Sequence, residues 1–224
     1  MTYTGVVTTG GSSQVRRLHD VVIRKANVSP QSNNAYLLTC LASGEQLLVD
    51  AADDAPALLA LVDEAAADGG RGLAHVVTTH QHWDHHRALP EVIAATGATS
   101  SAGTDDADAL PVPPDRRLVH GDTVTVGALT LEVVHLRGHT PGSVALVLRP
   151  ADGSTHLFTG DSLFPGGVGN TWQDAAKFAS LIDDVERRIF DRLPDDTWVY
   201  PGHGDDTTLG VERPHLGEWR ARGW

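Results

Sequence analysis

Cysteine is nearly absent from this sequence, and Cys40 is the single example among 224 residues. A disulfide within the chain is therefore excluded, and nothing points to an oxidising compartment. Cys40 lies in the apolar run 35–41, which favours a small buried side chain over a nucleophile. The first residues lack the apolar segment of a signal peptide, and no apolar run is long enough to span a bilayer. We therefore expect a cytoplasmic location.

Positive charge is also scarce. The chain has 17 Lys and Arg against 29 Asp and Glu, which gives a net charge of −12 with histidine taken as neutral. This balance argues against nucleic acid and anionic membranes as partners, because both attract a basic surface. The hydrophobic content of 41% can build a sizeable core, and no linker divides the chain. We expect a single domain over residues 1–224, with 1–14 as a loose lead-in, and the oligomeric state stays open.

Histidine, by contrast, is abundant and concentrated. Four of the twelve histidines fall within the stretch 78–86, directly after the apolar run 74–77 that predicts a buried strand. Alternate side chains of an extended segment point the same way, so His80, His82 and Asp84 can converge on one point while His85 faces a second direction. Imidazole and carboxylate ligands suit zinc, and also iron or manganese. The stretch predicts a metal site, with room for a second ion at His85.

Periodicity and turn signals predict strands alternating with helices. Apolar faces and capping residues predict helices over 56–68, 86–95 and 175–190, and a short amphipathic tail over 211–222. Strands are expected at 15–28, 35–41, 46–50, 74–79, 99–102, 118–119, 123–126, 129–136, 144–148, 156–158 and, last, 198–200. Strands followed by helices, twice along the chain, imply two sheets packed face to face with helices outside.

Five motifs resemble those of one family. The stretch 79–85, Thr-His-Gln-His-Trp-Asp-His, resembles the T-H-x-H-x-D-H signature of the metallo-β-lactamase-fold hydrolases. Four further family motifs stand in order at 47–50, 138–143, 159–164 and 201–204. The resemblance covers most of the chain. It implies an α/β fold, a four-layer αβ/βα sandwich of two mixed β-sheets flanked by helices.

The resemblance also implies a set of metal ligands. One ion is implied at His80, His82 and His139, the other at Asp84, His85 and His203, with Asp161 bridging both. The expected cofactor is a pair of divalent ions, zinc first, with iron or manganese as alternatives. The ions would activate a bridging hydroxide, which Asp84 would help to orient, and Asp50 would support the metal loop from below. The remaining histidines match no ligand position and are expected to be structural or solvated: His19, His75, His86, His120, His135, His156 and His215.

The end of the chain indicates a subgroup. The stretches 202–207 and 212–214 look most like the small, single-domain glyoxalase II-like (hydroxyacylglutathione hydrolase-like) enzymes, which split thioesters of a small thiol. The implied function is a binuclear metal-dependent thioesterase acting on a small-molecule thioester or ester. Two-domain members have a basic helical domain for glutathione. Here the tail offers only Arg213, Arg220 and Arg222 as cations, so glutathione is not the expected best thiol.

Other functions remain open at this point. Persulfide dioxygenases share these motifs but use a single iron held by two histidines and one aspartate. Lactonases also contain the Gly-His-Thr-Pro-Gly-Ser stretch found at 138–143. A metal-binding or oligomeric scaffold would be a non-enzymatic alternative. The glycine-rich stretch 164–172 begins and ends in aromatic residues and is expected to face the substrate.

Overall fold

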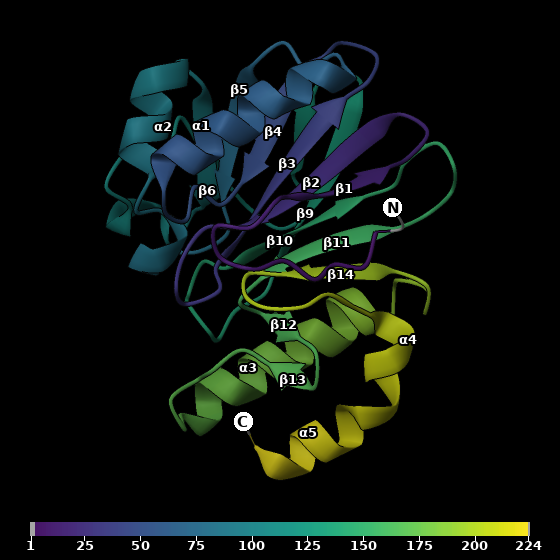
Figure 1. Ribbon diagram of the computed structural model, residues 1–224. Coiled ribbons are helices and arrows are strands. Elements are labelled where there is room, and N and C mark those ends of the chain that lie inside the picture. The colour runs from purple at the N-terminus through teal and green to yellow at the C-terminus, as the bar shows by residue number, and fades with distance from the viewer. Residues whose placement is uncertain (1–2, 224) are drawn as a thin grey trace.

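The computed structural model of the chain describes residues 3–223. Two β-sheets pack face to face, and helices cover the outer side of each (Figure 1). The predicted four-layer αβ/βα sandwich is therefore confirmed. Among the described helices, none combines the length and the apolar character that a bilayer span demands.

The first sheet takes its seven strands in chain order, from β1 to β7. Strands β1 to β4 form an antiparallel meander, and β4 to β7 run parallel. Helices α1 (Ala55–Glu64) and α2 (Leu89–Thr96) connect these parallel strands and cover the outer face. The strands are β1 (Gln14–Arg17), β2 (Val21–Asn27), β3 (Asn34–Cys40), β4 (Gln46–Val49), β5 (Leu73–Thr78), β6 (Thr99–Gly103) and β7 (Arg116–Leu118).

The second sheet has six strands in the order β15-β14-β11-β10-β9-β8. Helix α3 (Ala175–Val185) and helix α5 (Leu216–Arg222) lie on its outer side (Figure 1). The short helix α4 (Leu209–Glu212) follows β15 and leads to α5. A small hairpin of two strands, β12 and β13, follows β11 along the chain and precedes α3. The strands are β8 (Thr123–Val126), β9 (Leu129–His135), β10 (Val144–Leu148), β11 (His156–Gly160), β12 (Leu163–Phe164), β13 (Gly167–Val168), β14 (Trp198–Pro201) and β15 (Thr207–Thr208).

Alternation along the central strands builds three apolar layers. In β3, Tyr36 and Leu38 pack between the sheets, whereas Ala35 and Leu37 pack toward α1 and α2. Strand β10 repeats the pattern between the other sheet and α3. Successive side chains of a strand point to opposite faces, so a strand buried on both sides reads as one continuous apolar run. The metal loops lie outside all three layers, at the ends of strands.

Several element boundaries differ from the sequence prediction. The single strand predicted over 15–28 is wrong, because the chain turns at residues 18–20 and pairs β1 with β2. A further two-residue strand, β15, follows the predicted last strand. The predicted helix over 56–68 ends as a 3₁₀ turn over Ala65–Asp68, and the one over 175–190 ends as a π-turn over Glu186–Phe190. The tail is a helix pair, α4 and α5, rather than one segment.

Helix α1 and the turn that follows it are capped at both ends. Asp54, with a φ of 49°, caps the helix by accepting a hydrogen bond from the Ala57 N–H at 3.2 Å. Gly69, with a φ of 80°, ends the following turn in the left-handed region that glycine adopts without strain.

The lead-in carries no helix or strand over residues 3–13. Two hydrogen bonds nevertheless hold its first described residues in place. The Tyr3 hydroxyl donates to Asp206 at 2.7 Å, and the Gln14 side chain accepts from the Thr4 N–H at 2.8 Å. Met1 and Thr2, which belong to the predicted loose segment, lie outside the described residues.

His156 is a buried structural histidine in β11. Its Nδ1 lies 2.9 Å from the Tyr200 hydroxyl and its Nε2 lies 2.9 Å from Ser154 Oγ, so a neutral ring is satisfied on both sides. Burial, reinforced by Arg16 and partly opposed by Asp152, lowers the pKa of His156 to about 4.

This histidine makes a prediction about stability and pH. The unfolded chain takes up a proton on His156 below its ordinary pKa of about 6.5, whereas the folded chain resists until about pH 4, so folding stability falls as the pH drops across that window. Between pH 7 and 5, metal-free wild type should lose about 2 kcal/mol more unfolding free energy than His156→Gln. Urea unfolding at both pH values measures this difference. Parallel losses in the two proteins would contradict it.

Candidate metal centre

The motif 79–85 leaves the first sheet at the end of β5. Thr79 follows the strand, and its N–H and hydroxyl both donate to the buried carboxylate of Asp50, at 2.7 and 2.8 Å. Asp50 itself follows β4, with a φ of 60°. A 3₁₀ turn over Trp83–His85 then brings the ring of His85 to 4.1 Å from that of His80, measured between centroids. Asp50 therefore fixes the direction in which the metal loop leaves the sheet.

The other three predicted ligands come from the second sheet. His139 follows β9, Asp161 follows β11 and His203 follows β14, each in the loop after its strand. The Asn34 N–H at the start of β3 donates to the Gly202 carbonyl at 2.8 Å, which ties this loop edge to the first sheet. The candidate site therefore lies where strand ends of the two sheets meet.

The seven predicted ligands come together as two sets of three, with Asp161 between them. We call His80, His82 and His139 the first set, and Asp84, His85 and His203 the second set; within each, the nearest ligand atoms lie within 4.8 Å of one another. His80 Nε2 and His82 Nδ1 are 3.1 Å apart, as are His85 Nε2 and His203 Nε2. The predicted ligands therefore form clusters with the spacing of a metal site.

Asp161 lies between the two sets. Its Oδ2 is 3.6 Å from His139 Nε2 in the first set and 3.5 Å from His203 Nε2 in the second. Its Oδ1 is 3.4 Å from His85 Nε2. Glycine is required opposite this carboxylate, because a Cβ on Gly202 would lie 2.2 Å from Asp161 Oδ1.

Four histidines are oriented through the ring nitrogen that faces away from the cluster. The Nδ1 atoms of His139 and His203 lie 2.8 and 2.9 Å from the carbonyls of Asn170 and Gln31. His85 Nδ1 lies 2.9 Å from Asp50 Oδ2. His80 Nδ1 lies 3.1 Å from the Thr79 hydroxyl, which is itself bound to Asp50. Such contacts fix the tautomer and aim Nε2 at a metal ion.

The charges of the cluster suit a cation. Burial lowers the pKa of His80 well below its usual range, so its ring is neutral and keeps a lone pair for a ligand bond. A hydrogen bond from His203 holds the pKa of Asp84 far below its usual range, so that carboxylate is ionised. Burial alone would lower the pKa of His85, but the carboxylates of Asp161 and Asp50 outweigh it and raise that pKa. The carboxylates therefore attract positive charge to this point.

Two buried polar atoms support a fit to metal ions. Within residues 3–223, neither His139 Nε2 nor Asp161 Oδ1 has a hydrogen-bond partner. An unpaired buried polar atom is costly unless an ion or water satisfies it. Both atoms face the cluster, so divalent cations would satisfy them.

Comparison with known proteins agrees with this geometry. The profile of the Metallo-beta-lactamase superfamily matches residues 28–203, which contain all seven predicted ligands. The chain belongs to the metallo-β-lactamase superfamily. Membership in this superfamily and the two clusters together indicate divalent metal binding.

The chain is also similar to a hydrolase of known name within this superfamily. The chain is 41% identical over 175 residues to a hydroxyacylglutathione hydrolase from Fuscovulum blasticum, an alignment that covers 77% of this chain and 63% of that one. The chain therefore spans less than two thirds of that relative's length.

Two solved structures extend the similarity. One is titled TTHA1623 in a di-iron-bound form; it is 32% identical, with a TM-score of 0.65, and the match covers 84% of this chain and 95% of the other. The other is the B3 metallo-beta-lactamase BLEG-1, at 26% identity and a TM-score of 0.77, covering 88% and 99%. The metallo-β-lactamase fold is thus common to all three chains.

Two residues near the cluster were not predicted from the sequence. Asn33 Nδ2 donates to the Asp84 carboxylate and to the Asp84 carbonyl, both at 3.0 Å. The second is Asp106, whose contacts are described below. His86, the histidine beside His85, instead has a structural role: it is buried, and its Nε2 lies 3.0 Å from the Gln81 carbonyl.

Trp172 covers one side of the first set. Its ring lies 5.4 Å from the rings of both His139 and His82, stacked on the former and edge-on to the latter. The side chain is 55% exposed, and Trp172 and Gln173 both have positive φ, at 54° and 61°. A non-glycine residue held in this region signals a structural constraint, often at a binding site. Trp172 ends the stretch 164–172 that was expected to face the substrate.

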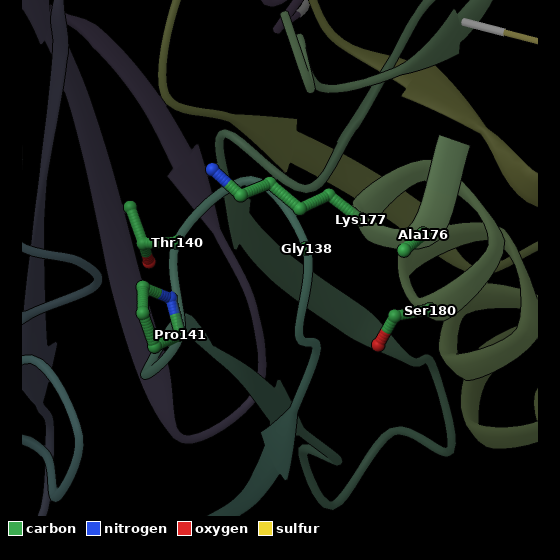
Figure 2. Close-up of a pocket in the computed structure, with 6 residues that line it drawn as sticks. All are labelled: Gly138, Thr140, Pro141, Ala176, Lys177 and Ser180. Carbon is green, nitrogen blue, oxygen red and sulfur yellow. The ribbon is translucent and has the colours of Figure 1, made fainter. Parts of the chain in front are cut away.

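A pocket is lined in part by the residues that flank His139, Gly138 and Thr140 (Figure 2). It has a volume of about 290 Å³ and is lined by Gly138, Thr140, Pro141, Ala176, Lys177 and Ser180. Figure 2 shows the Lys177 side chain extending from α3 across the pocket toward Thr140. The Lys177 ammonium also lies 5.9 Å from the centre of the Trp172 ring. A mostly apolar pocket with one cation therefore adjoins the exposed tryptophan.

Proposed function

We propose that this chain is a binuclear metal-dependent hydrolase that cleaves thioesters of small thiols. The observation that carries the proposal is Asp161, whose oxygens face histidines of both sets. A shared carboxylate suits two ions about 3.5–4 Å apart. The 41% identical relative is a hydroxyacylglutathione hydrolase, which supports a thioester as the substrate. The structural neighbour in a di-iron-bound form supports a site for two ions.

The proposed ligands follow the two sets. His80, His82 and His139 would hold one ion, Asp84, His85 and His203 the other, and Asp161 would bridge them. We propose zinc in both positions, with iron or manganese as alternatives, because imidazole and carboxylate ligands suit all three metals. When bound, two such ions lower the pKa of a shared water toward neutrality and polarise a carbonyl oxygen.

The protein's own groups prepare this reaction. The donor amide of Asn33 fixes the ionised carboxylate of Asp84, which we propose also orients the attacking water. Trp172 forms an apolar wall beside the first set, where it can exclude bulk water from the scissile bond. No protein nucleophile is needed in this scheme.

The substrate is expected to be a small thioester whose thiol is not necessarily glutathione. In the tail, Arg220 is paired with Glu186 and Asp183, and Arg213 is paired with Asp195. These guanidinium groups are therefore occupied within the protein. Lys177 stands beside Trp172 instead, and we propose that a carboxylate of the substrate reaches it.

The Lys177 contact can be tested by measuring KM and kcat separately for Lys177 variants. For a thioester that carries a carboxylate, Lys177→Gln should raise KM about fivefold and leave kcat nearly unchanged, since an exposed charge contact contributes about 1 kcal/mol. Lys177→Arg should restore most of the affinity. Arg187→Gln, which removes an equal charge from the end of the same helical segment, is the control. Equal KM changes for a neutral thioester would contradict a charge contact.

A substrate panel tests the reaction class. The metal-loaded chain should release free thiol from thioesters, with a modest rate on S-lactoylglutathione and a better one on the ester of another thiol. An efficiency on S-lactoylglutathione of about 10⁷ M⁻¹s⁻¹ or more would contradict the expected thiol preference. A lactone and a β-lactam belong in the same panel.

Oxygen uptake with glutathione persulfide, measured with an oxygen electrode, distinguishes the proposed hydrolase from a persulfide dioxygenase. A dioxygenase would consume oxygen with one iron, whereas the proposed hydrolase should consume none.

A further inference from the structure

Asp106 is a completely buried carboxylate outside the two ligand sets. It follows β6, in the segment between the strand and the 3₁₀ turn at Ala107–Ala109, and has 0% relative exposure. An ionised carboxylate is rarely buried without a specific set of partners. Its contacts therefore identify what it does.

Those contacts join the two loops of the first set. Asp106 Oδ2 accepts from the Gln81 N–H at 3.0 Å and from the Thr140 hydroxyl at 2.6 Å, and Oδ1 accepts from the Gly142 N–H at 2.7 Å. Gln81 lies between His80 and His82, and Thr140 directly follows His139. One side chain therefore fixes the position of both loops that carry the first set.

Two backbone positions near Asp106 require glycine, because a side chain at either one would clash. A Cβ on Gly142 would lie 2.4 Å from the Asp106 N and 2.8 Å from its Oδ1. A Cβ on Gly103 would lie 1.9 Å from the Gly142 carbonyl oxygen. Glycine at both points allows the end of β6 to reach the His139 loop, which brings the Asp106 carboxylate within hydrogen-bond distance of three donors.

Asp50 is a second buried carboxylate that contacts a loop carrying predicted ligands. It accepts from the Thr79 N–H and hydroxyl and contacts His85 Nδ1, so it is directly joined to the second set. Asp106 contacts neither His85 nor its neighbours through any of its three hydrogen bonds. Asp50 thus reaches His85 of the second set directly and His80 of the first set through Thr79, whereas the hydrogen bonds of Asp106 reach only the loops of the first set.

We infer that Asp106 is the positioning residue of the first metal set. It holds His80, His82 and His139 in register through Gln81 and Thr140, and its charge favours a cation there. The inference rests on the proposed ligand assignment. Removing a partner that orients metal ligands typically lowers metal affinity about 10–100-fold, and here the loss should be confined to one of two sites.

The test measures zinc affinity by chelator competition in two backgrounds. His203→Ala leaves the first set intact, and His82→Ala leaves the second set intact. Asp106→Asn, which keeps the shape but removes the charge and one acceptor, should weaken zinc about 10–100-fold in the His203→Ala background. In the His82→Ala background it should change the affinity less than about threefold. Asp50→Asn is the matched control and should weaken zinc in both backgrounds, because Asp50 contacts His85 directly and His80 through Thr79.

Metal-free thermal unfolding of each variant separates a positioning role from a general loss of stability. If Asp106→Asn does not fold, Thr140→Val removes only one of the three hydrogen bonds and should weaken zinc in the His203→Ala background alone. Equal losses in both backgrounds, or a lowered melting temperature with unchanged zinc affinity, would overturn the inference. A folded wild-type protein that binds no zinc, iron or manganese would instead overturn the proposed function.

Discussion

His82→Ala is expected to lower thioester hydrolysis at least about a thousandfold, which corresponds to about 4 kcal/mol of lost transition-state stabilisation. The proposed first ion loses one of its three histidines and with it the geometry that positions the water and the carbonyl. The fold should persist, because His82 contacts the rings of His80, His139 and Trp172 and belongs to none of the three apolar layers.

Two measurements check this expectation. The unfolding free energy of the metal-free variant should stay within about 1 kcal/mol of wild type, because His82 is half-buried and lies outside the apolar core. His215→Ala, which removes a half-exposed histidine of the tail, should retain wild-type activity. A folded His82→Ala variant that keeps more than about a tenth of the wild-type rate would contradict the assignment of His82 as a metal ligand.

Asp161→Ala should have the largest effect on metal content. As the proposed shared ligand it contacts both ions, so its loss should reduce the occupancy of both positions and bring the total below one ion per chain after dialysis. His203→Ala should keep about one ion, because the first set and Asp161 remain. The His203 Nε2 atom lies 3.1 Å from His85 Nε2, 3.4 Å from Asp84 Oδ2 and 3.5 Å from Asp161 Oδ2, so its neighbours are the second set and the proposed shared ligand.

Metal analysis by mass spectrometry compares these two variants with wild type under identical dialysis. The order of metal content should be wild type, then His203→Ala, then Asp161→Ala. Equal metal content in the two variants would show that Asp161 is not shared. Wild-type content in both would show that the ligand assignment is wrong.

The seven clustered residues were predictable because each stands in a short motif at a strand end. Strand ends at one edge of a sandwich meet in space, so motifs far apart in the sequence can share one site. Asp106 left no comparable signal. Its donors are 25, 34 and 36 positions away in the chain, and a carboxylate among the loop residues 103–114 reads as solvated until the packing is known.

The element predictions failed where local sequence carries little turn information. The turn that separates β1 from β2 contains neither glycine nor proline, so the stretch 15–28 reads as one strand. Strand β15 has two residues, too few to show any alternation. The stacking of Trp172 on His139 was also not predictable, because a tryptophan after a glycine-rich loop gives no indication of its partner.

The central claim is that two ions in one cluster support thioester hydrolysis. Its most direct test is free-thiol release by metal-free protein as zinc is added in increments, with dissolved oxygen recorded in parallel. The account predicts that the rate rises until about two equivalents of zinc are bound per chain, without oxygen uptake. Saturation at one equivalent, or no thiol release from any thioester by the fully loaded chain, would contradict it.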